Sequence, residues 1–455
     1  MNNNELVPTK ENLIDTVYKD TIDRNKDIVY FYNILQVQKT TSSIAIDGKW
    51  GSGKTFFVKQ TQLVITALNL SSTMDEETKA QVTARLPFTK DEKENNYNSL
   101  VAIYYDAWEN DNDTDPILSI LYEITKQLSI DFSLTDKKIF KAAGSIIDAI
   151  SGRNTTKILD ALTADDPYTK FKNQKKIEEN IKTFLSNLLA ERGNRLIIFI
   201  DELDRCKPDF AIHLLEQIKH YIYDERITFV FSINLEQLQH TVKHYYGYGF
   251  DSCRYLDKFF DLRITLPPAN MEKFYNQLGL NTSYWIDIIS KRIINMLNLQ
   301  LREITRFHSQ VTAAVYKPTH NDNSESYLFS SVNKSEKKIL LCIVPLLIGL
   351  NLTDSSLYTN FVNGKNVTPL KELFKNDDAK SLLHDMLNPN EVLDSQEGKT
   401  LISCDQLVER FYNAIFVTRY TGIKYQTRMG DYVFDKYSKN FALEAANMMT
   451  PFAKL

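Results

Sequence analysis

The stretch Ser42–Val58 reads SSIAIDGKWGSGKTFFV, and it decides the fold. It passes from a short apolar segment, Ile44–Asp47, through a turn with three glycines into Thr55–Leu70, which has the length and apolar content of a covered helix. The whole chain contains only 14 glycines. Their concentration in this turn indicates a place where the main chain must approach a ligand closely.

The turn matches the pattern Gly-x-x-x-x-Gly-Lys-Thr of a phosphate-binding loop, between a predicted strand and a predicted helix as the mechanism requires. Main-chain N–H groups of such a loop form an anion-binding nest, and the following helix adds the positive end of its dipole. A glycine-rich turn without a ligand is the alternative, which the strand–turn–helix context disfavours. Lys54 is expected to reach the β- and γ-phosphates and to act in catalysis, and the Thr55 hydroxyl to bind Mg²⁺. The expected nucleotide-binding residues are Gly48, Lys49, Trp50, Gly51, Ser52, Gly53, Lys54, Thr55 and Phe56.

Two adjacent acids follow the continuous apolar run Leu196–Ile200, which is typical of a central parallel strand. Asp201 lies where such sheets place their ligands, and we expect it to hold Mg²⁺. Glu202 is the natural group to orient or deprotonate the attacking water. The alternative is that either acid caps a turn or pairs with Arg205.

Two further polar or aromatic residues follow predicted strands. Asn234 ends the fourth strand, and it is equally suited to bond the γ-phosphate or the attacking water and to cap the next helix. Trp108 follows the second strand, and we favour a large core aromatic over a direct ligand contact.

Strand patterns alternate with helical patterns in the first half of the chain. The strands are expected at Ile44–Asp47, Leu100–Tyr105, Leu196–Ile200, Ile227–Asn234 and Leu262–Pro268. Five strands separated by helices predict an α/β fold, a three-layer sandwich around a parallel doubly wound sheet. We expect a P-loop NTPase core over 1–268 with a helical insert at about 131–170, a helical lid-like segment over 269–316, and a helical C-terminal region over 317–455.

Composition sets broad limits for these 455 residues. A net charge of −4 gives no support for nucleic-acid binding, although it does not exclude a local basic patch. Four widely spaced cysteines indicate reduced thiols. The polar N-terminus has no secretory pattern, and the longest apolar run, Ile339–Leu350, is too short to cross a bilayer and is interrupted by Pro345. We therefore expect a cytoplasmic protein with no integral membrane segment, in which this run is a buried helix.

Five motifs together resemble the KAP family of P-loop NTPases, in the additional-strand catalytic-glutamate division. They are GKWGSGKT (Gly48–Thr55), YYDAWEND (Tyr104–Asp111), IFIDELDRC (Ile198–Cys206), YLDKFFDLRITLPP (Tyr255–Pro268) and LREITRF (Leu301–Phe307), and the resemblance covers about 10–310. It implies ATP hydrolysis with Mg²⁺ and an insert before the second acidic motif. Many relatives carry transmembrane helices in that insert, and this chain has none there. The resemblance also implies a role in bacterial defence against phage.

Basic residues in the last two motifs are candidates to reach the γ-phosphate and stabilise the transition state. Arg254 directly precedes the fourth motif and Lys258 lies within it, while Arg302 and Arg306 lie four residues apart in the fifth. We select Arg302 as the candidate, and a solvated basic stripe is the alternative for each of them.

The sequence therefore predicts a Mg²⁺-dependent ATPase that powers or gates a larger assembly, with protein partners or further copies of itself. The alternative function is a slow nucleotide-dependent switch that recruits a partner through its helical C-terminal half.

Overall fold

The computed structural model describes residues 7–38, 42–89, 99–128, 181–221, 224–280, 284–315, 333–375, 377–393, 400–421 and 425–447. The insert predicted at about 131–170 lies outside these residues. The chain divides into two compact units, of which the first is Leu6–Lys273 and the second begins at Phe274.

The first unit is built around a five-stranded sheet in the order β2-β3-β4-β1-β5, in which every neighbouring pair is parallel. The strands are β1 Ser42–Asp47, β2 Leu100–Asp106, β3 Arg195–Asp201, β4 Ile227–Ile233 and β5 Leu262–Thr265. Every residue of β3 and β4 is buried, because helices cover both faces of a parallel sheet. The prediction of five parallel strands is confirmed.

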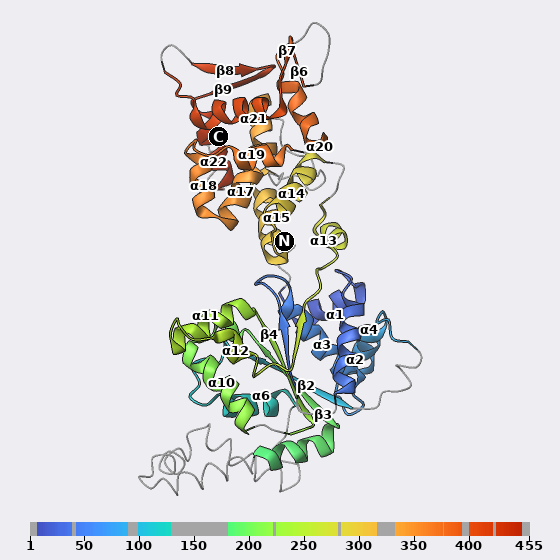
Figure 1. Cartoon of the computed structure of the whole chain (residues 1–455). Helices are drawn as coiled ribbons and strands as arrows, with labels where there is room; N and C mark the ends of the chain where they lie inside the picture. The colour runs from blue at the N-terminus through green and yellow to red at the C-terminus, as the bar shows by residue number, and fades with distance from the viewer. Residues whose placement is uncertain are drawn as a thin grey trace. The chain divides into compact units, whose positions relative to one another are not determined.

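Helices cover both faces of the sheet (Figure 1). A hydrophobic core fills the space between the sheet and each layer of helices. One layer contains α1 Lys10–Lys19, α2 Asn25–Val37, α3 Lys54–Leu68 and α4 Glu76–Thr83. The other contains α6 Pro116–Gln127, a helix over 181–192, α10 Pro208–Tyr221, α11 Leu235–Tyr246 and α12 Ser252–Leu256. Alternation along β3 assigns Ile197 and Phe199 to the first core and Ile198 and Ile200 to the second. The predicted three-layer sandwich is confirmed.

The second unit is mainly helical, as the sequence predicts, and α13 Met271–Leu278 contains the boundary between the units. Its other elements are α14 Trp285–Met296, α15 Leu301–Val315, α16 Lys334–Lys338, a π-helical turn Ile339–Ile343, α17 Val344–Thr353, α18 Ser355–Val362, α19 Thr368–Leu373, α20 Asp377–Lys380, a 3₁₀ turn Ser381–Met386, α21 Cys404–Tyr412, a second π-helical turn Asn413–Val417 and α22 Ser438–Ala446. Two short strand pairs were not predicted: β6 Glu391–Val392 with β7 Thr400–Leu401, and β8 Gln426–Met429 with β9 Tyr432–Asp435.

The apolar run Ile339–Leu350 forms a π-helical turn followed by the first turns of α17, and nearly all of it is buried. Pro345 lies in the first turn of α17, directly after the π-helical turn, and it has no N–H to donate to a carbonyl of that turn. The prediction of a buried helix is confirmed. Over the described ranges, no helix is both long and apolar enough to cross a membrane.

Candidate functional site

The glycine-rich loop joins the end of β1 to the start of α3, with two residues in the left-handed region. Gly51 has φ 82° and Gly53 has φ 90°, which side chains other than glycine adopt only at a cost. A Cβ at Gly48 would lie 2.9 Å from Ser52 Oγ and 3.4 Å from Lys54 Cδ, so a side chain there would crowd both of these loop side chains. The Gly48 N–H donates to Ile233 O at the end of β4, 3.2 Å away, so the loop is fixed to the sheet.

Lys54 is the first residue of α3, and only 8% of it is exposed. Its Nζ donates to Gly48 O at 2.5 Å and to Lys49 O at 3.1 Å, so the side chain folds back over the loop. Burial lowers the pKa of Lys54, and the charges of Asp204, Asp201 and Glu202 oppose that shift. The lysine and the acids that follow β3 therefore share one electrostatic environment.

The other loop residues offer polar atoms and main-chain groups. Ser52 Oγ is buried and has no hydrogen-bond partner within the described part of the chain. Thr55 and Phe56 are half-buried in the first turn of α3, whereas Lys49 and Trp50 are exposed. A buried hydroxyl without a partner beside two left-handed glycines fits an anion held in this loop.

Asp201 ends β3 and is 1% exposed. Tyr104 Oη, from β2, donates to its Oδ2 at 3.0 Å, and the Glu202 N–H donates to its Oδ1 at 3.0 Å. Burial raises the pKa of Tyr104, so the phenol remains a donor. A carboxylate such as that of Asp201 and a hydroxyl such as that of Thr55 are hard oxygen donors of the kind that Mg²⁺ prefers.

Glu202 has φ 60°, the left-handed region that non-glycine residues rarely occupy. Its carboxylate forms an ion pair with Arg205 Nε. Burial, and then the charge of Asp201, raises the pKa of Glu202 to about 7, and Arg205 opposes this rise. The pairing with Arg205 was one of the alternatives left open by the sequence, and the structure shows it.

Arg205 also contacts two tryptophans. Its Cζ lies 5.6 Å from the ring centroid of Trp50 and 5.5 Å from that of Trp108, which are cation–π distances. Trp108 is 53% exposed, so the expectation of a core aromatic is wrong. Its ring lies against the guanidinium of Arg205 and belongs to neither hydrophobic core.

Asp204 links the loop to the end of β4. Trp50 Nε1 donates to Asp204 Oδ2 at 2.6 Å, and the main-chain N–H of Asn234 also donates to this carboxylate. Burial raises the pKa of Asp204. The Asn234 side chain accepts from the Gln237 N–H at 3.4 Å and so caps α11. Of the two roles that the sequence left open for Asn234, the structure thus shows the cap, and the phosphate contact stays a prediction.

Arg24 is a functional candidate that the sequence reasoning missed. It precedes α2, is 3% exposed, and donates to Ser52 O at 3.2 Å and to Gly53 O at 3.5 Å. No motif singles out this arginine, and its partners in the loop are 28 and 29 residues away in the sequence.

Arg302 and Arg306 lie on α15 of the second unit, and both are exposed. Arg254 and Lys258 are exposed in the first unit. Contact of Arg302 with a nucleotide stays a prediction.

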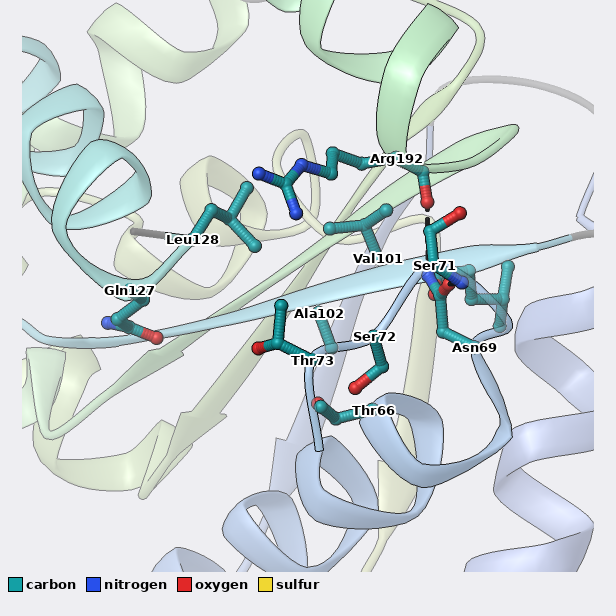
Figure 2. Close-up of a pocket in the computed structure, with 11 residues that line it drawn as sticks. Thr66, Asn69, Ser71, Ser72, Thr73, Val101, Ala102, Gln127, Leu128 and Arg192 are labelled. Carbon is teal, nitrogen blue, oxygen red and sulfur yellow. Dashed lines mark hydrogen bonds between the residues drawn. The ribbon is translucent and has the colours of Figure 1, made fainter. Parts of the chain in front are cut away.

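Figure 2 shows a separate pocket at the opposite end of β2, lined by Thr66, Asn69, Ser71, Ser72, Thr73, Leu100, Val101, Ala102, Gln127, Leu128 and Arg192. Asn69 Nδ2 donates to Leu100 O at 2.7 Å, and Gln127 both accepts from the Tyr104 N–H and donates to Tyr104 O. These side chains form hydrogen bonds with the main chain of β2 along its outer edge, the edge that is not paired with β3. The pocket lies at the amino end of β2, whereas Asp201 and the loop lie at the carboxyl ends of their strands.

Comparison with known proteins bears on this site. The family model described as the KAP family P-loop domain matches residues 24–317, which is more than half of the chain. An uncharacterized protein of Methanocaldococcus jannaschii is 51% identical over 47 residues, 10% of this chain and 24% of that protein, so the match spans about a quarter of that relative. The solved structure of the Aeropyrum pernix ORC2 protein, in ADPNP–ADP complexes, matches with a TM-score of 0.30 and 11% identity over 91% of this chain and 96% of that one.

Proposed function

The chain belongs to the KAP family of P-loop NTPases, and on that premise we propose that it hydrolyses ATP with Mg²⁺. Membership of this family indicates nucleotide binding and hydrolysis. The observation that carries the proposal is the sheet register, which places Asp201 of β3 level with Ser232 of β4 and with Ile46 of β1, two residues before the phosphate loop; the charges of Asp201 and Glu202 also act on Lys54. A cation for the phosphates, an acid for the metal and a second acid for water are the parts that this reaction needs.

In the proposed reaction, the loop N–H groups hold the β- and γ-phosphates, and Lys54 exchanges its two carbonyl partners for phosphate oxygens. The Thr55 hydroxyl and Asp201 hold Mg²⁺, which supplies neutralising charge to the phosphate oxygens when it is bound. Glu202 accepts a proton from a water molecule while the oxygen of that water attacks the γ-phosphorus. The bond between the γ-phosphorus and the β-phosphate oxygen breaks, and ADP leaves. Asn234 and Arg302 are proposed to contact the γ-phosphate region.

One observation favours the slower alternative function, a nucleotide-dependent switch. Glu202 is paired with Arg205, and a carboxylate that is already bonded is a poor proton acceptor until that pair opens. In this alternative, ATP binding changes the state of the chain, and the helical second unit recruits a partner.

A single set of measurements separates the two functions. Phosphate release and ATP affinity are measured for the wild type, Lys54→Ala and Glu202→Gln, with Glu76→Gln as control, because Glu76 is an exposed acid on α4. For an ATPase, we expect Glu202→Gln to keep the wild-type affinity within about threefold and to lose roughly 100-fold or more in turnover. Tight binding without turnover in the wild type would favour the switch, and no binding would overturn both functions.

The finer assignments rest on the sequence and on kinship. We propose cytoplasmic action within a larger assembly, in defence against phage, with domains at 1–268, 269–316 and 317–455. Plaque counts on cells that carry the wild type or Lys54→Ala would test the role in defence, and equal counts would argue against it.

A further inference from the structure

The turn between α1 and α2, over Asp20–Arg24, has an unusual backbone. Asp20 has φ 50° and Asp23 has φ 61°, so two non-glycine residues within four positions adopt the left-handed conformation. Such residues cost free energy and persist where the surrounding structure holds them. The contacts of this turn show what holds it.

Arg24 connects the turn to the phosphate loop and to the chain after β5. Its Nη2 donates to Ser52 O at 3.2 Å and to Pro267 O at 3.0 Å, and its Nη1 donates to Gly53 O at 3.5 Å. All three acceptors are main-chain carbonyls. One guanidinium therefore joins the last two residues of the loop to the segment that leaves the sheet.

The charge of Arg24 is buried without an ion pair to any of the described carboxylates. Burial lowers the pKa of Arg24 to about 10, with the charge of Asp27 opposing the shift. Its Nε has no hydrogen-bond partner among the described residues. Burying a cation in this way is unfavourable unless its hydrogen bonds offset the lost hydration, so these three carbonyl bonds matter to the local structure.

The same turn holds the segment Pro267–Lys273, which ends at the boundary of the first unit. The Asn270 N–H donates to Ile22 O at 3.1 Å. Lys273 Nζ donates to Asp23 Oδ1 at 2.9 Å and to Asp20 Oδ2 at 3.2 Å. Both left-handed aspartates are therefore partners of the last residue of the unit.

We propose that Arg24 is a positioning residue of the nucleotide site, which locks the end of the phosphate loop to Pro267–Lys273 so that the two segments are ordered together. This inference rests on the proposed function. By accepting from a charged donor, the carbonyls of Ser52 and Gly53 polarise their peptide groups, so the N–H groups of Gly53 and Lys54 become stronger donors to a phosphate.

The test compares Arg24→Lys and Arg24→Gln with a matched control, Arg195→Lys. Arg195 is also a buried arginine whose pKa is lowered by burial, and it donates to Glu225 O and Thr228 Oγ1, each at 3.0 Å. It lies at the start of β3, the end of the strand opposite to Asp201. Arg195→Lys therefore perturbs a buried arginine whose hydrogen bonds to Glu225 O and Thr228 Oγ1 are outside the phosphate loop.

Hydrogen exchange of the nucleotide-free full chain is the first measurement. Neither a lysine nor a glutamine side chain can replace the forked guanidinium that donates to three carbonyls. In both Arg24 variants, the amide hydrogens of 48–54 and of 266–273 should therefore exchange roughly tenfold or more faster than in the wild type. Exchange in β3 should stay at the wild-type rate. Arg195→Lys should leave 48–54 and 266–273 unchanged.

ADP affinity is the second measurement. We expect Arg24→Lys to weaken ADP binding roughly tenfold and Arg195→Lys to change it by less than about twofold.

Three exchange results would overturn the inference. In the first, 48–54 and 266–273 keep the wild-type exchange rate, and in the second only one of these segments exchanges faster. In the third, β3 exchanges faster to the same extent, which would mean a general structural role for Arg24. If the wild type does not bind ADP, the proposed function fails, while the exchange experiment still decides whether Arg24 joins the two segments.

Discussion

Arg205 and Glu202, three residues apart, form an ion pair directly after the strand that ends in Asp201. The guanidinium of Arg205 also lies at cation–π distance from Trp50 in the phosphate loop and from Trp108 after β2. The position of the candidate catalytic acid is thus linked through Arg205 to two aromatic side chains. Movement of the loop on nucleotide binding would disturb this arrangement.

Tryptophan fluorescence should therefore report nucleotide binding. Trp50 is 45% exposed and donates to Asp204, whereas Trp285 lies in the second unit on α14. We expect MgATP to change the emission, and we expect Trp50→Phe to reduce the change, with Trp108 as the remaining reporter beside Arg205, while Trp285→Phe keeps it. The measurement is a fluorescence titration of the three proteins, and a full-sized change in Trp50→Phe would contradict the expectation.

Replacement of Asp201 should change the requirement for Mg²⁺. Asp201→Asn removes the charge proposed to hold the metal, so half-maximal ATPase activity should need roughly tenfold more Mg²⁺ or higher. Tyr104→Phe removes only the hydrogen bond to Oδ2, and a shift of about two- to fivefold is expected. Titration of activity against Mg²⁺ measures both, and an unchanged midpoint in Asp201→Asn would exclude its role as a metal ligand.

The left-handed glycine Gly53 should contribute to nucleotide binding as well as to stability. Gly53→Ala and Gly279→Ala both place a side chain at a positive φ, 90° and 73°, and each should lose about 1–2 kcal/mol of stability. A Cβ at Gly279 meets nothing within 4 Å, so this variant isolates the conformational effect. Thermal denaturation and ADP affinity are measured together, and only Gly53→Ala should bind ADP more weakly. Equal affinities would show that the loop tolerates the change.

Packing in the second unit depends on Gly349 of α17. A Cβ there would lie 2.7 Å from Ile293 Cγ2 and 2.8 Å from Leu297 Cδ1, both on or next to α14, so Gly349→Ala should destabilise this unit by about 1–3 kcal/mol. Gly249→Ala is the control, since its Cβ would meet nothing within 4 Å. Thermal denaturation compares the two, and equal melting temperatures would mean that α14 moves away at no cost.

The sheet and the loop could be predicted because their signals are local. The continuous apolar run Leu196–Ile200 indicates a strand covered on both faces, and the motif Gly48–Thr55 lies where its mechanism requires. The strand pair β8–β9 escaped prediction because its strands have four residues each and little apolar alternation.

Contacts between distant residues could not be predicted. Trp50 and Asp204 are 154 positions apart, and Arg24 and Pro267 are 243 apart. Such pairs depend on how strands are ordered in the sheet and on which loops meet at its carboxyl edge. Trp108 was assigned to the core by its size, but its ring is exposed and lies against Arg205, a residue 97 positions away in the sequence.

The side chains of Gln127 and Asn69 have a consequence for solubility. They occupy main-chain groups of β2 at Tyr104 and Leu100, on the edge of the sheet that has no neighbouring strand among the described residues. An open strand edge is a template on which another molecule can add a strand, the first step of aggregation. These two amides occupy main-chain groups that an added strand would need, so they oppose strand addition at β2 as charged residues or prolines do in other sheets.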